Sequence, residues 1–526
     1  MKKEPKSTIA ASAAEIKYSF EMPPDPIPES RIAETIKTEV VVVGAGTAGL
    51  VCANSAAENG AKVILISASS HPISRGGSNH AINTRLTRKL GIQYDIGKNF
   101  KQEIDRAGGR IDQGKWALFA RKSGEAMDWM IDKMEAAGYT AVLERGEIDP
   151  DNVISTFPGS HSFIGGKIKK SGMGQSLVVN TLAKTAQAAG VQIHYKMIAR
   201  QLLRENQNQG RVTAVIAQNS DGQYIKYVGS RAIVLATGDF TKDREMMAKY
   251  CPEMLPFVSM TPVNYDAQFK YGGLYAGDGH KMALWVGAAW QQAVPNAPLL
   301  SGGHFPTPQP YGGFKGLLVN KNGVRYCNED VNQTHEGFLL IYQPGRKIYA
   351  IWDSEYAARM APWYPRGSCW GNDSPQNVED VAAEWETAVE AGKIFKAESL
   401  QELAQKLGLD GETLQSTVDT YNGYCETGVD EEFFKRPGLL VPVKKKPFYG
   451  QPCTTPWFLL ATGGLRTNLK MQVLDTRDEV IPGLYVIGTM VGDMFANYYS
   501  FMPSGICLGA TCITFGYLVG KEIAKS

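Results

Sequence analysis

Three glycines near the N-terminus have the spacing of a phosphate-binding turn. Gly44, Gly46 and Gly49 form the pattern G-x-G-x-x-G directly after four consecutive valines. The first glycine allows a tight turn, the second lets a pyrophosphate approach the backbone, and the third lets the following helix pack on the strand. The N-terminus of that helix presents unpaired N–H groups and a positive dipole end to the phosphates. The pattern therefore predicts dinucleotide binding.

One expected partner of this turn is replaced by a neutral side chain. The next predicted strand ends in ILISAS, and Ser67 stands where an acidic residue usually binds the ribose hydroxyls. A serine hydroxyl can still hydrogen-bond a ribose. A further buried strand runs into ATGDF, which is either an ordinary strand end or a second contact to the phosphate or ribose. We favour the contact because the glycine turn is present.

Cysteine spacing, charge and hydropathy exclude several other classes of protein. The eight cysteines form no C-x-x-C pair, haem attachment motif or iron–sulfur spacing, so we predict no bound metal. The net charge of +2 does not indicate a nucleic-acid partner. No run reaches the ~18 apolar residues of a membrane helix, and the N-terminus is too weak for a signal peptide. We expect a cytoplasmic protein, although an exported chain whose leader had been removed would look the same.

The predicted elements place the glycine turn in a domain built from both ends of the chain. Strands and helices alternate from residue 38, and the pattern returns in IPGLYVIGTMVGD and in the C-terminal CITFGYLVGKEIA. The segment between them is richer in Pro, Trp and Tyr. We predict an extended N-terminal arm without a core, a first part of the dinucleotide domain, an inserted domain and a second part of the dinucleotide domain, over residues 1–36, 37–290, 291–455 and 456–526.

Motifs along the whole chain resemble those of one flavoprotein family. They are VVVGAGTAGL, SRGGSNHAIN, ATGDF, GDGHKMALWVGA, GLLVNKNGVRYCNED, TVDTYNGYCETGVDEEFFKRP, TGGLRTN, GLYVIG and CITFGYLVG, in this order. The set is similar to that of fumarate reductases, succinate dehydrogenase flavoproteins and 3-ketosteroid dehydrogenases. The resemblance implies an α/β fold, with a Rossmann-like FAD-binding domain and an inserted α+β capping domain. It also implies hydride transfer between flavin N5 and a carbon–carbon bond beside an electron-withdrawing group.

The resemblance, carried over by position, implies a set of FAD contacts. Ser78 falls where succinate dehydrogenases carry a covalently flavinylated histidine, and His80 lies two positions away, so we predict non-covalent FAD. A helix expected from about residue 505 would point its N-terminus at the flavin pyrimidine carbonyl. The implied contacts are Gly44, Ala45, Gly46, Thr47, Ala48, Ser67, Gly76, Gly77, Ser78, Asn79, Ala236, Thr237, Gly238, Asp278, Gly464, Gly488, Thr489, Gly505, Cys507 and Leu508.

The departures from fumarate reductases concern the substrate. Their proton-donating arginine falls at Gln333, and their second carboxylate-binding arginine falls at Tyr498. Their two histidines fall at Val294 and at Leu459 or Leu460. A desolvated carboxylate without a paired cation is unfavourable, so we expect a substrate other than a small dianion.

Aromatic residues gather in the segments expected to face the flavin. Each could equally be a core residue, but as a set they favour a bulky, largely uncharged substrate such as a steroid or polyphenol. They are Trp290, Phe305, Tyr311, Phe314, Trp457, Phe458, Phe495, Tyr498, Tyr499 and Phe501.

A replacement proton donor must come from elsewhere in the chain. Tyr498 and Tyr499 precede a turn expected to contact the flavin, and a phenol can donate a proton or hydrogen-bond a carbonyl. His335 could act as an acid near neutral pH, whereas Gln333 could only orient a carbonyl or a water. Any of the four could instead be structural. Less well placed candidates are His304 and Tyr311.

Three functions fit these features. The first is an ene-reductase or dehydrogenase acting on an enone-like C=C bond of a small-molecule ring compound. The second is a small-acid reductase of the fumarate type, which the missing arginines and histidines disfavour. The third is an FAD-carrying electron-transfer protein without substrate chemistry of its own. No second nucleotide motif identifies the electron partner, which we leave open between NAD(P)H, reduced flavin and a redox protein.

Overall fold

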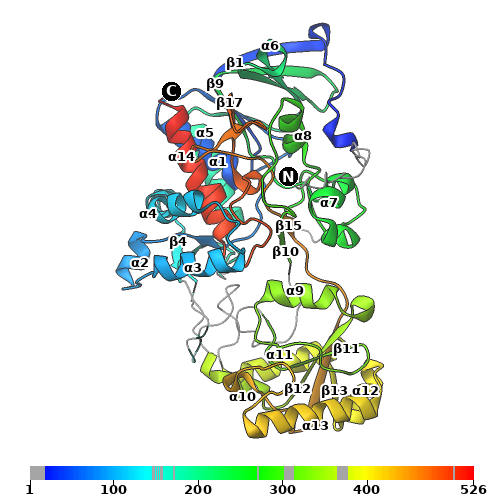
Figure 1. Cartoon of the computed structure of the whole chain (residues 1–526). Coiled ribbons are helices and arrows are strands. Elements are labelled where there is room, and N and C mark those ends of the chain that lie inside the picture. The colour runs from blue at the N-terminus through cyan, green and yellow to red at the C-terminus, as the bar shows by residue number, and fades with distance from the viewer. Residues whose placement is uncertain are drawn as a thin grey trace, which may run out of the picture.

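A mainly parallel sheet carries the turn with the three glycines (Figure 1). The structure is a computed structural model and describes residues 18–144, 149, 151, 153, 158–169, 172–268, 272–300, 302, 313–363, 377–501 and 504–525. Residues 40–43 of β1 pair in parallel with β2 on one side and with β9 on the other. These buried valines confirm the predicted α/β class. In spatial order the strands are β16 (Gln472–Leu474), β17 (Val480–Val486), β9 (Tyr224–Leu235), β1 (Ile32–Val43), β2 (Val63–Ile66) and β6 (Gln192–His194).

Strand β17 comes from the C-terminal part of the chain but joins this sheet in parallel to β9, so both ends of the chain build it. The outermost strand β16 runs antiparallel to β17. Strands β1 and β9 continue beyond the parallel region, where an antiparallel pair extends the sheet on β9. That pair is β7 (Ile198–Arg204) and β8 (Val212–Gln218).

Helix α1 starts directly after the glycine turn and packs against α5 and α14 (Figure 1). The approach to α14 is close because a glycine faces α1: a Cβ at Gly520 would lie 2.7 Å from the carbonyl oxygen of Cys52. The C-terminal helix begins near residue 506 and runs through a π-helical stretch, Leu508–Thr514, before α14. The helices of this larger part are α1 (Thr47–Glu58), α2 (Arg85–Lys89), α3 (Ile96–Arg106), α4 (Gln113–Ala136), α5 (Gln175–Ala188), α6 (Glu205–Asn208), α7 (Arg244–Tyr250), α8 (Asp278–Trp285) and α14 (Phe515–Ile523).

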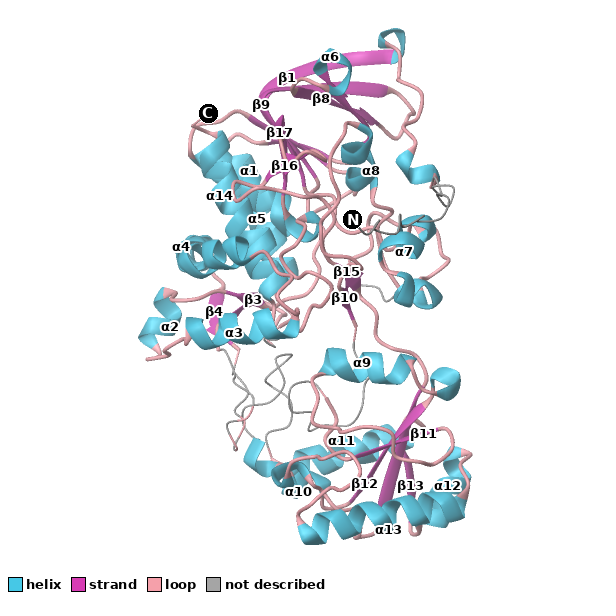
Figure 2. Cartoon of the chain, in the orientation of Figure 1, coloured by secondary structure: helices cyan, strands magenta, loops and turns pink. Residues whose placement is uncertain are grey.

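A small antiparallel sheet lies beside α2, α3 and α4 (Figure 2). Its central strand β5 pairs with both neighbours. Strand β3 belongs to the segment SRGGSNHAIN, so this sheet fixes the glycine pair of that segment. Its strands are β3 (Asn79–His80), β5 (Ser160–Ile164) and β4 (Thr140–Leu143).

The smaller part of the molecule is built on a four-stranded antiparallel sheet (Figure 2). Its central strand β12 alternates between two hydrophobic clusters, with Trp352 in one and Tyr349 in the other, as the pleat of a strand requires. In spatial order the strands are β11 (Leu317–Asn320), β12 (Ile348–Asp353), β14 (Phe448–Cys453) and β13 (Phe395–Ala397). The helices are α9 (Gln333–Ile341), α10 (Tyr356–Arg359), α11 (Val378–Glu390), α12 (Leu400–Leu407) and α13 (Gly411–Thr427).

The chain passes between the two parts through two short paired strands. Strand β10 (Pro298–Leu299) leads toward the smaller part, and β15 (Leu460–Ala461) returns from it. The two strands pair in antiparallel register, Leu299 opposite Leu460. The smaller part is therefore an insertion whose ends lie side by side.

The N-terminal arm differs from the expected segment without a core. Strand β1 already begins at Ile32, and Phe20 is buried in a cluster that includes Met246 and Tyr250 of α7. Its aromatic ring anchors the arm to the larger part, which the polar composition of the segment did not reveal. Within the described residues, no helix is long and apolar enough to cross a membrane.

Candidate cofactor and active site

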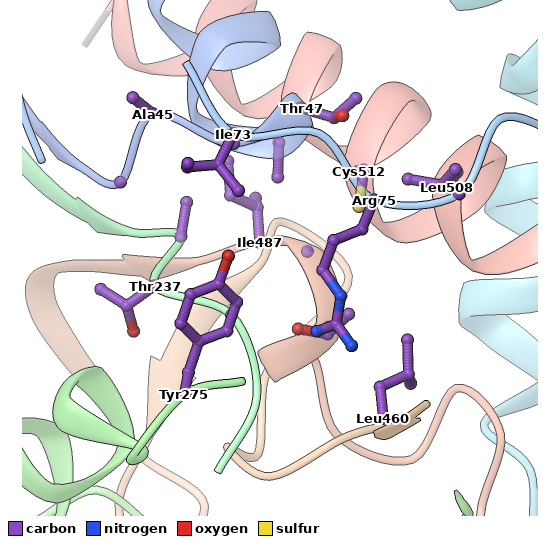
Figure 3. Close-up of a pocket in the computed structure, with 18 of the residues that line it drawn as sticks. Ala45, Thr47, Ile73, Arg75, Thr237, Tyr275, Leu460, Ile487, Leu508 and Cys512 are labelled. Carbon is purple, nitrogen blue, oxygen red and sulfur yellow. The ribbon is translucent and has the colours of Figure 1, made fainter. Parts of the chain in front are cut away.

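A cavity opens at the carboxyl ends of β1, β2 and β9, the place where open α/β sheets bind ligands (Figure 3). Its walls come from the turns after these strands and from the C-terminal segment. Its described lining comprises residues 43–48, 67–69, 73, 75–78, 197–199, 236–238, 265, 275, 278, 299, 459–460, 487–489, 499, 501, 505, 507–508 and 512.

The glycine turn forms one wall, and its three glycines have different surroundings. A Cβ at Gly49 would lie 1.9 Å from the carbonyl oxygen of Gly44, so Gly49 permits the tight packing of α1. A Cβ at Gly46 would meet only the carbonyl oxygen of Ile73, at 3.9 Å. Gly46 therefore faces the open space of the cavity. The N-terminus of α1 has no side-chain cap, which leaves its N–H groups to a phosphate.

On the β2 side of this turn, the Ser67 hydroxyl is hydrogen-bonded to other groups of the protein. Its hydroxyl accepts the N–H of Ala45 at 3.3 Å and lies 2.8 Å from the hydroxyl of Ser69. The first residues of β7 line the same region. In a Rossmann-like domain the adenosine half of a dinucleotide lies on this side, so its other half extends in the opposite direction.

The opposite end of the cavity is largely apolar. Leu299, Leu459, Leu460, Phe501 and Leu508 line it. Figure 3 shows Leu460 on the side of the Arg75 guanidinium and Leu508 beside the start of the Arg75 side chain.

Arg75 extends into this apolar end of the cavity. Its guanidinium bonds to the carboxylate of Asp239 at 2.7 Å and to the carbonyl oxygen of Leu459 at 2.5 Å. It also lies 5.7 Å from the ring centre of Tyr275. The second oxygen of Asp239 accepts the hydroxyl and the N–H of Thr241, so this fully buried carboxylate is bonded at both oxygens.

Tyr499 lines the same end, against the start of the C-terminal helix. Its hydroxyl accepts the N–H of Cys507 at 3.3 Å, and its ring contacts Phe495 and Phe501. A phenol that accepts one hydrogen bond still carries a proton that it can donate. Tyr499 thus places a phenol hydroxyl at the apolar end of the cavity.

Tyr498 points away from the cavity and toward the smaller part. Its hydroxyl lies 3.0 Å from that of Thr334 and accepts the side-chain N–H of Asn332 at 3.2 Å, and its ring stacks on His335. Burial raises the pKa of Tyr498 to about 12. Desolvation by the surrounding chain lowers the pKa of His335, with Arg106 and Lys315 adding to the effect, although the side chain keeps contact with solvent.

Three further candidates remain, one at this junction and two outside the described residues. Gln333 is the first residue of α9, beside Asn332, which caps the helix. His304 and Tyr311 lie outside the described residues, as does Phe305. The structure therefore brings Tyr498 and His335 together and puts Tyr499 in the cavity.

A family profile described as "FAD binding domain" matches residues 39–502. The chain belongs to this family. A vinyl phenol reductase of Lactiplantibacillus plantarum is 28% identical over 521 residues, covering 93% of this chain and 95% of that protein. Among solved structures, a 3-ketosteroid Δ4-(5α)-dehydrogenase from Rhodococcus jostii RHA1 has a TM-score of 0.72 at 22% identity, covering 95% of this chain and all of that one. The open form of a flavocytochrome c3 fumarate reductase has a TM-score of 0.65 at 22% identity, covering 97% and 82%.

The predicted flavoprotein family and FAD cofactor are thereby confirmed, and the protein is an FAD-dependent oxidoreductase acting on carbon–carbon bonds. The cavity fits the cofactor on a second ground. The Thr489 hydroxyl lines the cavity and is buried, and it has no hydrogen-bond partner among the described residues. A bound dinucleotide would supply one, as buried polar groups require.

The cavity lining includes every implied FAD contact except Asn79 and Gly464. The Asn79 amide is turned into the wall, where it donates to the carbonyl oxygens of Gly77 and His161. Gly464 lies against the ring of His280, which leaves no room for a Cβ. These two positions support the wall rather than form its surface.

Sequence reasoning missed Arg75, Asp239 and Tyr275. Arg75 directly precedes the pair Gly76–Gly77, and Asp239 directly follows the strand motif at Gly238. A charged residue beside each of two predicted FAD-contacting turns was the available signal. The pairing itself depends on a contact across 164 positions of the chain.

Buried titratable groups lie behind the glycine pair. Burial raises the pKa of Glu144 to about 7, and this carboxyl accepts the hydroxyl of Ser162 and interacts with Ser78. Burial lowers the pKa of His80 to about 3. Both ring nitrogens of His80 have partners, Ser160 at 3.3 Å and Tyr94 at 3.1 Å.

Several aromatics expected at the substrate site are core residues. Trp290 stacks on Tyr250 at 3.8 Å between ring centres, and Phe458 lies in the same cluster. Phe314 lies in the core of the smaller part, and Phe495 in that of the larger part. Only Tyr499 and Phe501 of the expected set line the cavity among the described residues.

The motif GLLVNKNGVRYCNED also has a structural role. Arg325 is buried and pairs with Glu329 at 2.9 Å and with Asp430 at 2.8 Å, and Lys435 lies 3.2 Å from Glu329. These charges join α13's C-terminal loop to the sheet of the smaller part. Within the described part of the chain, no cluster of three or more metal-ligating side chains occurs.

Proposed function

We propose that the protein reduces or forms a C=C bond next to a carbonyl in a bulky, largely uncharged substrate such as a steroid or polyphenol. One observation carries this proposal. Arg75 is the only cationic side chain among the described residues that line the cavity, and it already bonds to Asp239 and Leu459. A dicarboxylate would therefore enter an apolar end of the cavity without a cation to pair with its charge.

Hydride transfer at N5 is the chemistry that bound FAD supplies. The chain contributes an apolar wall that excludes water, and the Tyr499 hydroxyl, which can hydrogen-bond the substrate carbonyl or give a proton. A donor aimed at developing negative charge in a dry site is a strong catalytic contribution. Tyr498 and His335 lie where the smaller part meets the larger one, and we assign them to positioning that contact.

We propose that residues 291–455 form a capping domain between the two parts of the FAD-binding domain, residues 37–290 and 456–526. The pairing of β10 with β15 supports a hinge at its entry and exit. The Tyr498–Thr334 hydrogen bond and an ion pair of Arg436 with Asp149 join the cap to the larger part.

We also propose that FAD is held without a covalent bond. Ser78 cannot form the histidyl link, and the His80 ring is fully buried with a partner at each nitrogen. Acid precipitation should leave a colourless pellet and a yellow supernatant. Flavin that stays with the precipitated chain would contradict the proposal.

The substrate class can be tested without knowing the electron donor. The FAD-loaded protein is reduced with dithionite and mixed anaerobically with a 3-ketosteroid enone, a vinyl phenol or fumarate, while flavin absorbance is followed. We expect the 3-ketosteroid enone to reoxidise the flavin about 100-fold faster than fumarate does. Fast reoxidation by the vinyl phenol alone would support an uncharged substrate but contradict the requirement for a carbonyl. Fumarate at a comparable rate would favour the small-acid reductase, and reoxidation by protein acceptors alone would favour the electron-transfer protein.

A further inference from the structure

Arg75 lines the end of the cavity that would hold the flavin ring, and its guanidinium pairs with the buried Asp239 behind that wall. Among its described lining residues, Arg75 alone carries a positive charge and Asp278 alone a negative one. Asp278 accepts the hydroxyl of Tyr265 at 2.8 Å. Because the adenosine half points toward Ser67 and β7, the isoalloxazine half points toward Arg75.

The guanidinium of Arg75 is fixed in place from several elements. Asp239 follows β9, Leu459 precedes β15, and the Tyr275 ring lies before α8. Only 13% of the Arg75 side-chain surface is exposed to solvent, and the Asp239 side chain is completely buried. Its position is therefore set by the fold rather than by a ligand.

The positive charge of Arg75, fixed beside the flavin ring, would interact with any charge that develops on that ring. Two electrons and one proton convert the neutral oxidised isoalloxazine into an anion. Interactions between charges are strong where water is excluded. We propose that Arg75 stabilises the reduced flavin anion, and that Asp239 both positions Arg75 and offsets part of its charge, so that the pair sets the reduction potential. This inference rests on FAD binding and not on the identity of the substrate.

The two partners have opposite expected effects. Arg75→Gln removes the positive charge and leaves the buried carboxylate, so the ratio of reduced to oxidised flavin at a fixed potential should fall at least tenfold. Asp239→Asn leaves Arg75 without its counter-charge, so the ratio should rise at least tenfold. For two electrons a tenfold change corresponds to about 30 mV. The double variant should lie between the singles, and Arg75→Lys should stay within threefold of wild type.

The experiment uses the FAD-loaded protein without substrate. The potential is measured by slow reduction against a reference dye of known potential. Sulfite affinity is a second readout, because sulfite adds to oxidised flavin and leaves negative charge on the ring. It should weaken in Arg75→Gln and strengthen in Asp239→Asn. Arg359→Gln removes a matched pair with the buried Asp353 in the smaller part, at 3.0 Å, and should change neither readout.

Shifts of both single variants in the same direction, or within twofold of wild type, would overturn the proposal. If Arg75→Gln does not retain FAD, Asp239→Asn still decides by the sign of its shift. A purely structural pair would lower FAD affinity in both variants and leave the potential of the remaining holoprotein unchanged.

Discussion

The hydroxyl of Tyr499 accepts the backbone N–H of Cys507, with 3.3 Å between oxygen and nitrogen. This bond fixes the phenol at the start of the C-terminal helix, at the apolar end of the FAD cavity. The adjacent Tyr498 turns the other way and bonds to Thr334 of α9. Two neighbouring tyrosines thus serve different contacts, and their variants should separate chemistry from docking of the cap.

Tyr499→Phe should slow reoxidation of the reduced flavin by the enone substrate. Loss of one such donor typically costs about 10²–10³ in rate. FAD should stay bound, because the ring that lines the cavity is retained. Tyr498→Phe is the matched control and should cost less than about tenfold. Stopped-flow single turnover measures both, and equal rates in wild type and Tyr499→Phe would show that the proton comes from another group.

Gly46→Val should abolish FAD binding without unfolding the protein. The space beside Gly46 belongs to the cavity, where a side chain would occupy the place of the pyrophosphate. Flavin fluorescence titration should detect no binding, while circular dichroism stays that of the apoprotein. Gly423→Val, at a helix position with nothing within 4 Å of an added Cβ, is the control. A fully yellow Gly46→Val protein would place the phosphates elsewhere.

Arg325→Met should destabilise the protein and leave the FAD site intact. It leaves Glu329 and Asp430 buried with less compensating charge, which costs about 3–5 kcal/mol when a buried pair is broken. Thermal unfolding should show a clear drop in Tm, with FAD affinity unchanged within threefold. Lys406→Met removes the exposed pair with Glu402 and should shift Tm far less. Loss of FAD affinity at unchanged Tm would instead give this motif a role at the cofactor.

Glu144→Gln should alter the pH dependence of stability. Because burial raises the folded pKa to about 7, the folded protein keeps the proton above pH 4.5 while the unfolded chain releases it. Stability from this group is therefore present at low pH and is lost as pH rises from 4.5 to 7. From pH 5 to pH 8 the variant should gain up to about 3 kcal/mol relative to wild type.

Urea unfolding of the FAD-loaded protein at both pH values gives this difference. Glu390→Gln, at the exposed end of α11, serves as the control and should show none. An equal difference for the two variants would mean that Glu144 ionises as an exposed carboxyl does.

Local patterns were enough to predict the sheet and the phosphate turn. Only a few adjacent residues are needed for these predictions. The run Val40–Val43 indicates a buried strand, and the spacing of Gly44, Gly46 and Gly49 indicates the turn. The sequence predicted that both ends of the chain build one domain, because the segment of β17 is a short apolar strand like that of β1. The resemblance to the flavoprotein family then identified the dinucleotide as FAD.

Contacts between distant segments could not be predicted in the same way. The Arg75–Asp239 pair exists only because the fold brings two turns together across 164 positions. Aromatic composition did not reveal which face a ring occupies, so Trp290 and Phe314 were expected at the substrate site although both pack in cores. The sequence could not distinguish the roles of the neighbouring Tyr498 and Tyr499. The structure does, because the Tyr498 hydroxyl contacts Thr334 and the Tyr499 hydroxyl contacts Cys507.

The pairing of Leu299 with Leu460 also bears on how such a chain could diversify. An inserted segment whose two ends meet can be exchanged as one block without altering the strand order of its host. Both leucines also line the cavity, so a newly inserted segment would be connected directly to the cavity wall beside the flavin. Descendants of one ancestral flavin domain could thus acquire different substrates by replacing a contiguous stretch, while the glycine turn is inherited unchanged.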